Sequence, residues 1–279
     1  MAIPRFASAI AHITDLERDD PVAFRHALAL AVAIGRETEL VLLHGTDGKE
    51  DGFEHFPAIR QQLEAWGRLP ANSAKTDVYD LCQVAASKSL FDYKDPLQSL
   101  KRFLIDNPAD LLVMESEGRT GIPRWLHPSF SERLARDTRT MALFIHRGTS
   151  GFIDGDTGEI RIRRILLPVD SNPAAAAAVR KVIALAHLDQ PPVVEVTLLH
   201  VGERMPDVHR PNDFCAAWYE EVRQGDVVTS ILSVAKELSA DLIVMPTQGH
   251  QGILDALRGS ITEQVLRRAQ CPVLAIPEP

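Results

Sequence analysis

Residues 245–276 read MPTQGHQGILDALRGSITEQVLRRAQCPVLAI, and residues 114–145 read MESEGRTGIPRWLHPSFSERLARDTRTMALFI. The two stretches align without a gap, so that Gly118 pairs with Gly249 and Ser129 pairs with Ser260, both at an offset of 131 residues. Because residue type and spacing repeat together over the whole stretch, the chain is predicted to contain one structural unit twice.

The repeat continues toward the start of each half. NPADLLVM (107–114) and SADLIVM (239–245) precede the two stretches, and each is a polar start followed by an apolar run typical of a buried parallel strand. Each half opens with an apolar run that ends in Asp, followed by an alanine-rich helical segment and a second apolar run. In the first half these are IAHITD (10–15), residues 24–37 and ELVLLHG (39–45). In the second half they are ILLPVD (165–170), residues 173–187 and EVTLLHV (195–201). Asp15 and Asp170 are 155 residues apart, so the first half is longer by 24 residues between its second and fourth strands.

Strands alternating with helices predict an α/β fold, with two tandem open parallel sheets covered on both faces. The third strands are expected near KTDVYDLCQV (75–84) and AWYEEVRQ (217–224), each followed by a helix, at 96–106 and 226–238. Residues 148–164, GTSGFIDGDTGEIRIRR, predict a hairpin-like linker. The domains are accordingly predicted as 1–154 and 155–279.

Charge and cysteine content exclude several classes of protein. Lys and Arg total 30 against 38 for Asp and Glu, a net charge of −8, so a general nucleic-acid or anionic-membrane partner is not expected. Cys82, Cys215 and Cys271 lack the spacing of zinc ligands and indicate buried thiols in a reducing compartment. With no secretory apolar region near the N-terminus and no run of membrane-spanning length, we expect a cytoplasmic protein.

Taken together, the strand ending in Asp, the LLHV strand, the ADLIVM strand, the loop ending in Gly-Ser and the terminal CPVLAIP resemble the universal stress protein family, here as a tandem of two domains. The resemblance implies a Rossmann-like fold of the adenine-nucleotide alpha hydrolase type that binds ATP or AMP, without strong catalysis, in stress survival. It also implies that the last strands, 141–147 and 271–277, pair within the chain as an internal pseudo-dimer, which covers two sheet edges.

The chemistry of the second half suits a phosphate. Ligands of open parallel sheets bind beyond the carboxyl ends of the strands, and glycine permits a close backbone approach there. Ser260 begins a helix whose free amides and positive dipole end face an anion. The family's loop pattern, Gly-x2-Gly-x9-Gly-Ser/Thr, is matched at three of its four positions, with Pro at 246. The resemblance gives nucleotide-binding residues Asp170, Val201, Met245, Gly249, Gly259, Ser260 and Ile261, and no catalytic or metal-binding residue.

A structural explanation competes at each position. Ser260 and Glu263 form a capping-box pattern, as do Ser129 and Glu132, so helix capping alone explains a serine. In the first half Pro128 replaces Gly259, removing an N–H donor and adding bulk. Glu115 and Glu117 add negative charge there, and Asp15 is interpreted as a capping residue. The first half is therefore predicted not to bind a nucleotide in this way.

Pro246 is the departure from the family pattern inside the second half, because proline lacks an amide and restricts the residue before it. His44 and His200, at equivalent strand ends, are predicted to orient backbone rather than bind metal. His250 is predicted to be solvated, and Arg258 is a weaker phosphate-contact candidate.

Three functions remain open from the sequence. The first is a stress-response regulator whose bound adenine nucleotide carries the signal to an unidentified protein partner. The second is a slow ATPase, although no Walker lysine follows Gly259. The third is an interaction scaffold that binds no nucleotide, favoured if Pro246 closes the site. A Mg²⁺ requirement and homodimerisation of the whole chain are also open, and fold alone decides none of these.

Overall fold

The computed structural model describes residues 5–14, 22–35, 37–46, 53, 56–92, 94–116, 138–146, 148–188, 194–211, 216–247 and 260–278. The elements of the first half are β1 (Ala9–Ile13), α1 (Val22–Ile34), β2 (Thr38–Thr46), α2 (Ile59–Ala65), α3 (Asp77–Cys82), β3 (Val84–Asp92), α4 (Pro96–Asp106), β4 (Leu111–Ser116) and β5 (Met141–His146). Those of the second half are β6 (Arg164–Pro168), α6 (Ala176–Ala186), β7 (Val194–Val201), β8 (Ala216–Arg223), α7 (Val227–Glu237), β9 (Leu242–Thr247), α8 (Ile261–Leu266) and β10 (Val273–Pro277).

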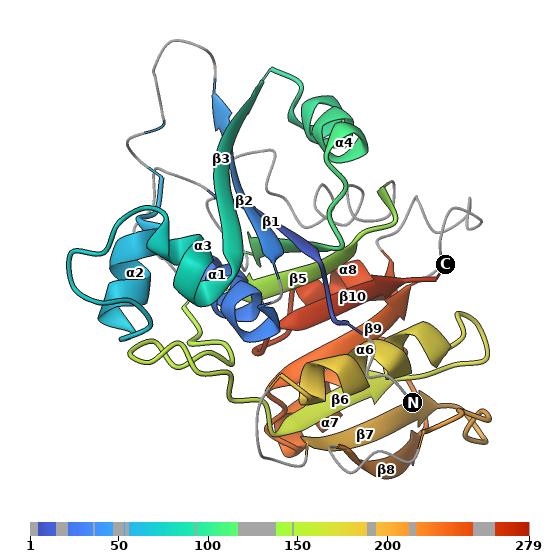
Figure 1. Ribbon diagram of the computed structural model, residues 1–279. Helices are drawn as coiled ribbons and strands as arrows, with labels where there is room; N and C mark the ends of the chain where they lie inside the picture. Colours follow the sequence, from blue (N-terminus) through green and yellow to red (C-terminus); the bar gives the residue numbers. More distant parts are fainter. Residues whose placement is uncertain are drawn as a thin grey trace.

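The described strands form one ten-stranded sheet in the order β3-β2-β1-β4-β5-β10-β9-β6-β7-β8 (Figure 1). All neighbours are parallel except β5 and β10, which pair antiparallel with Leu143 opposite Leu274. This confirms the α/β class and the pairing of the two last strands within the chain. The two halves therefore share a single sheet, and its two open edges are β3 and β8.

Helices cover both faces of this sheet, as the alternation of strands and helices predicted. One buried cluster joins α1, α2, α3 and α6 to the sheet, and the other joins α4, α7 and α8 to the opposite face. Each cluster contains residues of both halves, for example Leu28 with Ile183 and Leu100 with Val265. The halves therefore share their hydrophobic cores as well as their hydrogen-bonded sheet.

In each half, an aspartate at the equivalent repeat position anchors the first strand. Asp110 Oδ2 accepts hydrogen bonds from the amides of Ser8 and Ala9 at 2.6 and 3.2 Å, just at the start of β1. Asp241 Oδ2, at the repeat offset, accepts from the amides of Arg163 and Arg164 at 2.8 Å each, at the start of β6. The sequence repeat therefore extends to the hydrogen bonds that hold the first strand of each half.

Replacing Asp241 by alanine is expected to lower the free energy of unfolding by about 1–3 kcal/mol, because two backbone amides lose a charged acceptor. Chemical denaturation measures the change. The variant Asp110→Ala is expected to lose a similar amount, and Asp241→Asn, which keeps one acceptor oxygen, is expected to lose less. Unchanged stability of Asp241→Ala would contradict the anchoring role.

The predicted third strand of the first half, near residues 75–84, is wrong. Asp77–Cys82 form the helix α3, which buries Val78 and Cys82, four residues apart, on one face. Gln83 then takes a left-handed conformation, with φ of 54°, and turns the chain into β3 at Val84. The third strand of the second half, β8, lies where it was expected, and so do the helices α4 and α7.

The insertion in the first half lies between its second and third strands. Residues 47–83 separate β2 from β3, whereas residues 202–215 separate β7 from β8. This connection, which includes α2 and α3, accounts for nearly all of the 24 extra residues.

The linker between the halves is a packed hairpin, as predicted. Ile153 and Ile160 form an antiparallel bridge, and both are buried with Phe152 and Ile162. The hairpin is tied to the first half by two side chains: His26 Nε2 accepts from the Phe152 amide at 3.0 Å, and Trp66 Nε1 donates to the Gly155 carbonyl at 3.0 Å. The alanine-rich α1 is consequently buried on nearly all sides, between the sheet and this hairpin.

Candidate functional site

The sheet of the second half is divided at the carboxyl end of β6, between β6 and β9. The two strands pair only through Ile165 with Leu242 and Leu166 with Ile243, although both strands continue beyond these residues. In an open parallel sheet this is the point where the chain order reverses, and ligands bind in the crevice that opens there.

Two prolines explain why the pairing stops. Val169 N donates to Leu199 O on β7 at 2.8 Å, and Ile243 N donates to Pro272 O, just before β10, at 3.0 Å. Since backbone groups alternate in direction along a parallel strand, Pro168 faces β9 and Pro246 faces β6. Neither residue has an N–H to donate, so the two strands lose successive ladder hydrogen bonds at the same place.

The first half lacks this opening. There β1 and β4 pair through four successive residues, up to Ile13 with Met114. Ile13 and Glu115 stand at the repeat positions of Pro168 and Pro246 and supply the missing amides. The two halves were expected to differ at the nucleotide site because of Pro128. The pairing of the first and fourth strands is a second difference between them.

Asp170 and Val201 lie at the two strand ends beside the opening. Asp170, two residues after the end of β6, is exposed, and its Oδ1 accepts from the Ser171 amide at 2.7 Å. Val201 is the last residue of β7 and is partly exposed. Because Val169 N bonds to Leu199 O, the two strand ends are held side by side, with the Asp170 carboxylate after one and Val201 at the end of the other.

The two strand-end histidines orient backbone, as predicted. His200 Nδ1 donates to the Val169 carbonyl at 3.0 Å, and His44 Nδ1 donates to the Thr14 carbonyl at 3.1 Å, so both rings bridge the first and second strands of their half. Gly202 lies so close to His200 that a Cβ there would stand 2.3 Å from Nε2. Within the described residues no group of three or more His, Cys, Asp or Glu side chains is arranged to hold a metal ion.

Ser260 is the N-cap of α8, and its Oγ accepts from the Glu263 amide at 3.0 Å. This bond confirms the capping interpretation of the serine. The Glu263 carboxylate in turn bonds to Arg267, one turn further along. Ile261, at the first helical position, is 45% exposed, so the first turn of α8 is open to solvent on that side.

Met245, unlike Asp170 and Val201, lies in the hydrophobic core. Its side chain is 4% exposed and belongs to the buried cluster beneath α7 and α8. It supports β9 from the core and brings no free polar group to the opening. Sequence reasoning passed over Pro168, although its contrast with Ile13 in the aligned run ILLPVD against IAHITD was visible.

Several predicted positions lie outside the described residues. In the second half these are Cys215, Gly249, His250, Arg258 and Gly259. In the first half they are Asp15, Glu117, Gly118, Pro128, Ser129 and Glu132. In the part of the chain that the structure describes, no helix is both long and apolar enough to cross a membrane.

Comparison with known proteins agrees with this architecture. The family model described as the universal stress protein family matches residues 10–146 and 216–277. A universal stress protein of Methanocaldococcus jannaschii is 39% identical over 61 residues, which cover 22% of this chain and 36% of that protein. One from Mycobacterium tuberculosis is 25% identical over 201 residues, 61% of this chain and 62% of that protein. The matches therefore span less than two thirds of either relative.

Solved structures show the same fold over the full chain. The crystal structure of a universal stress protein from Archaeoglobus fulgidus superposes with a TM-score of 0.59 at 15% identity, covering 98% of this chain and 97% of that one. A protein from Pseudomonas aeruginosa, titled as functionally unknown, gives a TM-score of 0.61 at 14% identity, with 97% and 92% covered. At this level of identity the likeness concerns the fold alone.

Proposed function

Because the chain belongs to the universal stress protein family, as a member with two such domains in tandem, we propose that its second half binds ATP or a related adenine nucleotide and acts as a nucleotide-dependent regulator in a stress response. The division into domains 1–154 and 155–279 is part of this proposal. The observation that carries it is the opening between β6 and β9, with Asp170 and Val201 beside it and α8 beginning close by in the chain.

The opening offers groups for each part of a nucleotide. A ribose hydroxyl can donate to Asp170, whose carboxylate has acceptor sites beyond the one that Ser171 uses. Backbone groups at the end of β7, near Val201, are available to an adenine edge. Phosphates suit the segment that contains Gly249 and Gly259, which leads into the start of α8 at Ser260.

Pro246 sets the character of the site. Its backbone nitrogen is directed toward β6, so the proline ring contributes apolar surface there. The family pattern has a glycine with an amide N–H at this position. The bound nucleotide therefore relies on Asp170 at one end and on the 249–261 segment at the other. No Walker lysine follows Gly259, so the signal is assigned to the bound state rather than to turnover.

Calorimetric titration of ATP and AMP into the apo protein tests the proposal. We expect saturable binding that weakens by about 100-fold in Gly259→Pro, which gives the loop the proline of the first half and removes a donor to phosphate. The variant Pro246→Gly, which restores the family pattern, is expected to bind about tenfold more tightly.

The first half supplies the matched control. Asp170→Ala is expected to weaken binding, whereas Asp15→Ala, its repeat equivalent, is expected to leave the dissociation constant unchanged. Absence of binding in both the native protein and Pro246→Gly would overturn the proposal and favour the nucleotide-free scaffold. Steady phosphate release that Asp170→Ala abolishes would favour the ATPase instead.

A further inference from the structure

Among the described strands, β3 lies at one edge of the sheet. Thr38 N donates to Gln83 O at 3.1 Å, and β3 then pairs in register with β2 along its whole length. Because direction alternates along a parallel strand, Ala85, Ser87 and Ser89 bond to β2, while Ala86 and Lys88 direct their N–H and C=O groups away from the sheet. An exposed row of such groups is a template for another strand.

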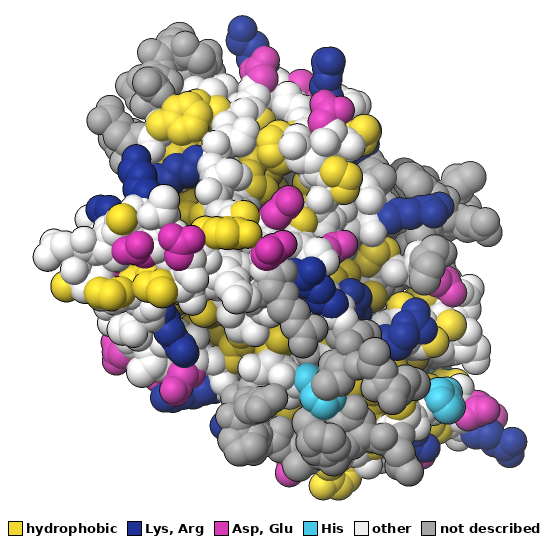
Figure 2. All heavy atoms as spheres, in the orientation of Figure 1, with side chains coloured by type: hydrophobic (Ala, Val, Ile, Leu, Met, Phe, Trp, Pro, Cys, Tyr) yellow, Lys and Arg dark blue, Asp and Glu magenta, His cyan; other side chains and the backbone are white. Residues whose placement is uncertain are grey.

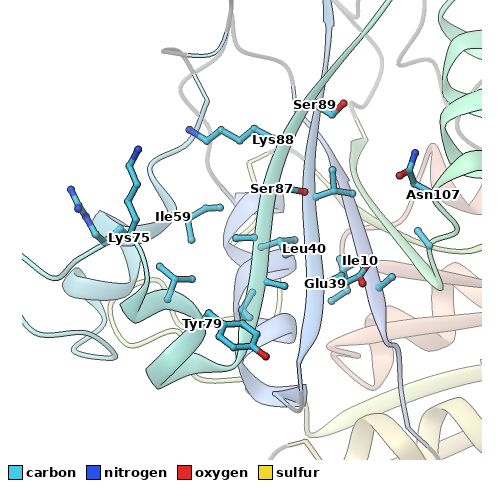
Figure 3. A pocket seen from close by; sticks show the side chains of 18 of the residues that line it. Ile10, Glu39, Leu40, Ile59, Lys75, Tyr79, Ser87, Lys88, Ser89 and Asn107 are labelled. Carbon is cyan, nitrogen blue, oxygen red and sulfur yellow. The ribbon is translucent and has the colours of Figure 1, made fainter.

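Both faces of the sheet are hollow beside this edge. A cavity of about 1220 Å³ is lined on one side by Ile59 and Val78, from α2 and α3, and on the other by Phe103 and Ala109, from α4 and the turn after it. In Figure 3, β3 runs between Ile59 and Lys75 on one side and Asn107 on the other. An added strand places alternate side chains on opposite faces, so each set would enter one of the two hollows.

The two hollows differ in charge. On the α2–α3 side, Lys75 and Lys88 extend toward the same opening (Figure 3), and no acidic partner stands beside either lysine among the described residues. Lys88 lies 5.4 Å from the centre of the Phe56 ring. Burial and the neighbouring Lys75 lower the pKa of Lys88, which means that its positive charge is incompletely compensated. Figure 2 shows Lys and Arg side chains gathered beside β3, above α2 and α3.

The α4 side carries the opposite sign. Glu39, on β2, and Asp106, at the end of α4, line that part of the cavity together with Phe103 and Ala109. A strand that fits both sides therefore has acidic side chains on the face toward α2 and α3, and apolar or basic side chains on the face toward α4.

We propose that the β3 edge binds an extended acidic segment of a partner protein, which joins the sheet beside β3 with its carboxylates facing Lys75 and Lys88. This partner site lies far along the sheet from the opening between β6 and β9 and does not depend on nucleotide binding. A second copy of the chain is a poorer occupant, since its β3 brings another Lys88. The acidic edge strand β8 of a second copy would also bind poorly beside β3, because Glu220 and Glu221 are already paired with Arg210 and Arg223.

The test is fluorescence anisotropy of a labelled, end-blocked peptide of eight alternating valine and glutamate residues, titrated with the full chain up to millimolar concentration. We expect saturable binding that falls at high salt, and little binding of the matching valine–lysine peptide. Lys88→Glu and Lys75→Glu are each expected to weaken binding by about tenfold.

A backbone variant separates strand addition from simple charge attraction. Ala86→Pro removes an outward N–H and leaves the bonds to β2 in place, so it is expected to weaken peptide binding by about tenfold while circular dichroism and melting temperature stay close to native. Val222→Pro is the matched control: Gly202 N donates to Arg223 O, so Val222 has the same outward direction on β8, and peptide binding is expected to stay unchanged.

Three results would overturn the proposal. One is the absence of acidic-peptide binding at millimolar protein. Another is equal loss of binding in Ala86→Pro and Val222→Pro. The third is a native dimer, seen by sedimentation velocity, that Ala86→Pro converts to monomer, because a second copy would then occupy the edge.

Discussion

Gly151→Ala is expected to lower the free energy of unfolding by about 3 kcal/mol, through backbone strain and a clash with His26 together. Gly151 has a φ of 64°, and a Cβ at this position would stand 2.2 Å from two atoms of the His26 ring. The ring is not free to move aside. Its Nδ1 donates to the Val22 carbonyl at 2.7 Å, its Nε2 accepts from the Phe152 amide at 3.0 Å, and its exposed fraction is 0%.

Chemical denaturation measures this loss, and a second glycine in the same linker provides the control. Gly148 has a φ of 75°, but a Cβ there would meet nothing within 4 Å. Gly148→Ala therefore carries the backbone strain alone, about 1 kcal/mol. Equal losses in the two variants would mean that His26 does not fix the hairpin against α1.

Acidification from pH 7 to pH 5 is expected to destabilise the protein by roughly 2 kcal/mol for each of two buried histidines. Burial lowers the pKa of His12 and of His26 from 6.5 to about 4. His12 Nδ1 donates to the Val113 carbonyl at 3.0 Å, and the ring is 3% exposed, while His26 must keep Nε2 unprotonated to accept from Phe152.

The direction follows from proton uptake. The unfolded chain binds protons on these histidines as the pH falls through 6.5, whereas the folded chain does so only near pH 4, so the stabilisation is present above pH 6.5 and is lost progressively below it. Burial lowers the pKa of His146 as well, which adds a loss of the same sign.

Free energies of unfolding measured by denaturant at several pH values between 5 and 7 test this directly. Replacing His26 by glutamine removes one titrating group and is expected to flatten the pH dependence, even if stability at pH 7 is lower. Replacing His209, an exposed side chain, serves as the control. A pH slope that is the same in native protein and in His26→Gln would refute the assignment.

The repeat in the sequence was sufficient for the fold because it aligned strands as well as loops. Once ADLLVM and ADLIVM were recognised as equivalent strands, the order within each half followed from the rules of parallel sheets. The pairing of the two last strands was implied by the family resemblance. The repeat failed in residues 75–84, which belong to an insertion with no counterpart in the second half. There Val78 and Cys82 have the period of a helix, and the true strand, Val84–Asp92, has few large apolar residues because it lies at an edge.

The sequence indicated candidate side chains for the site, but it did not indicate the course of the backbone there. Asp170, Val201 and Ser260 were selected by resemblance, and the structure places the first two side by side and Ser260 at a helix start. The division of the sheet depends on which way each amide points, and that direction follows only from the register of the strands. Pro168 and Pro246 acquire their common meaning from this register, since they are far apart in the sequence and face each other across the opening.

The pairing of β5 with β10 has a consequence for how the molecule can vary. In a symmetric dimer of identical chains, every substitution at the seam appears on both sides at once. Here Leu143 faces Leu274 across the seam, and each is encoded separately, so one side can change while the other compensates. The two halves of the covalent tandem can therefore change independently. One half can gain an insertion, as the first half has done between β2 and β3, while the shared sheet stays intact.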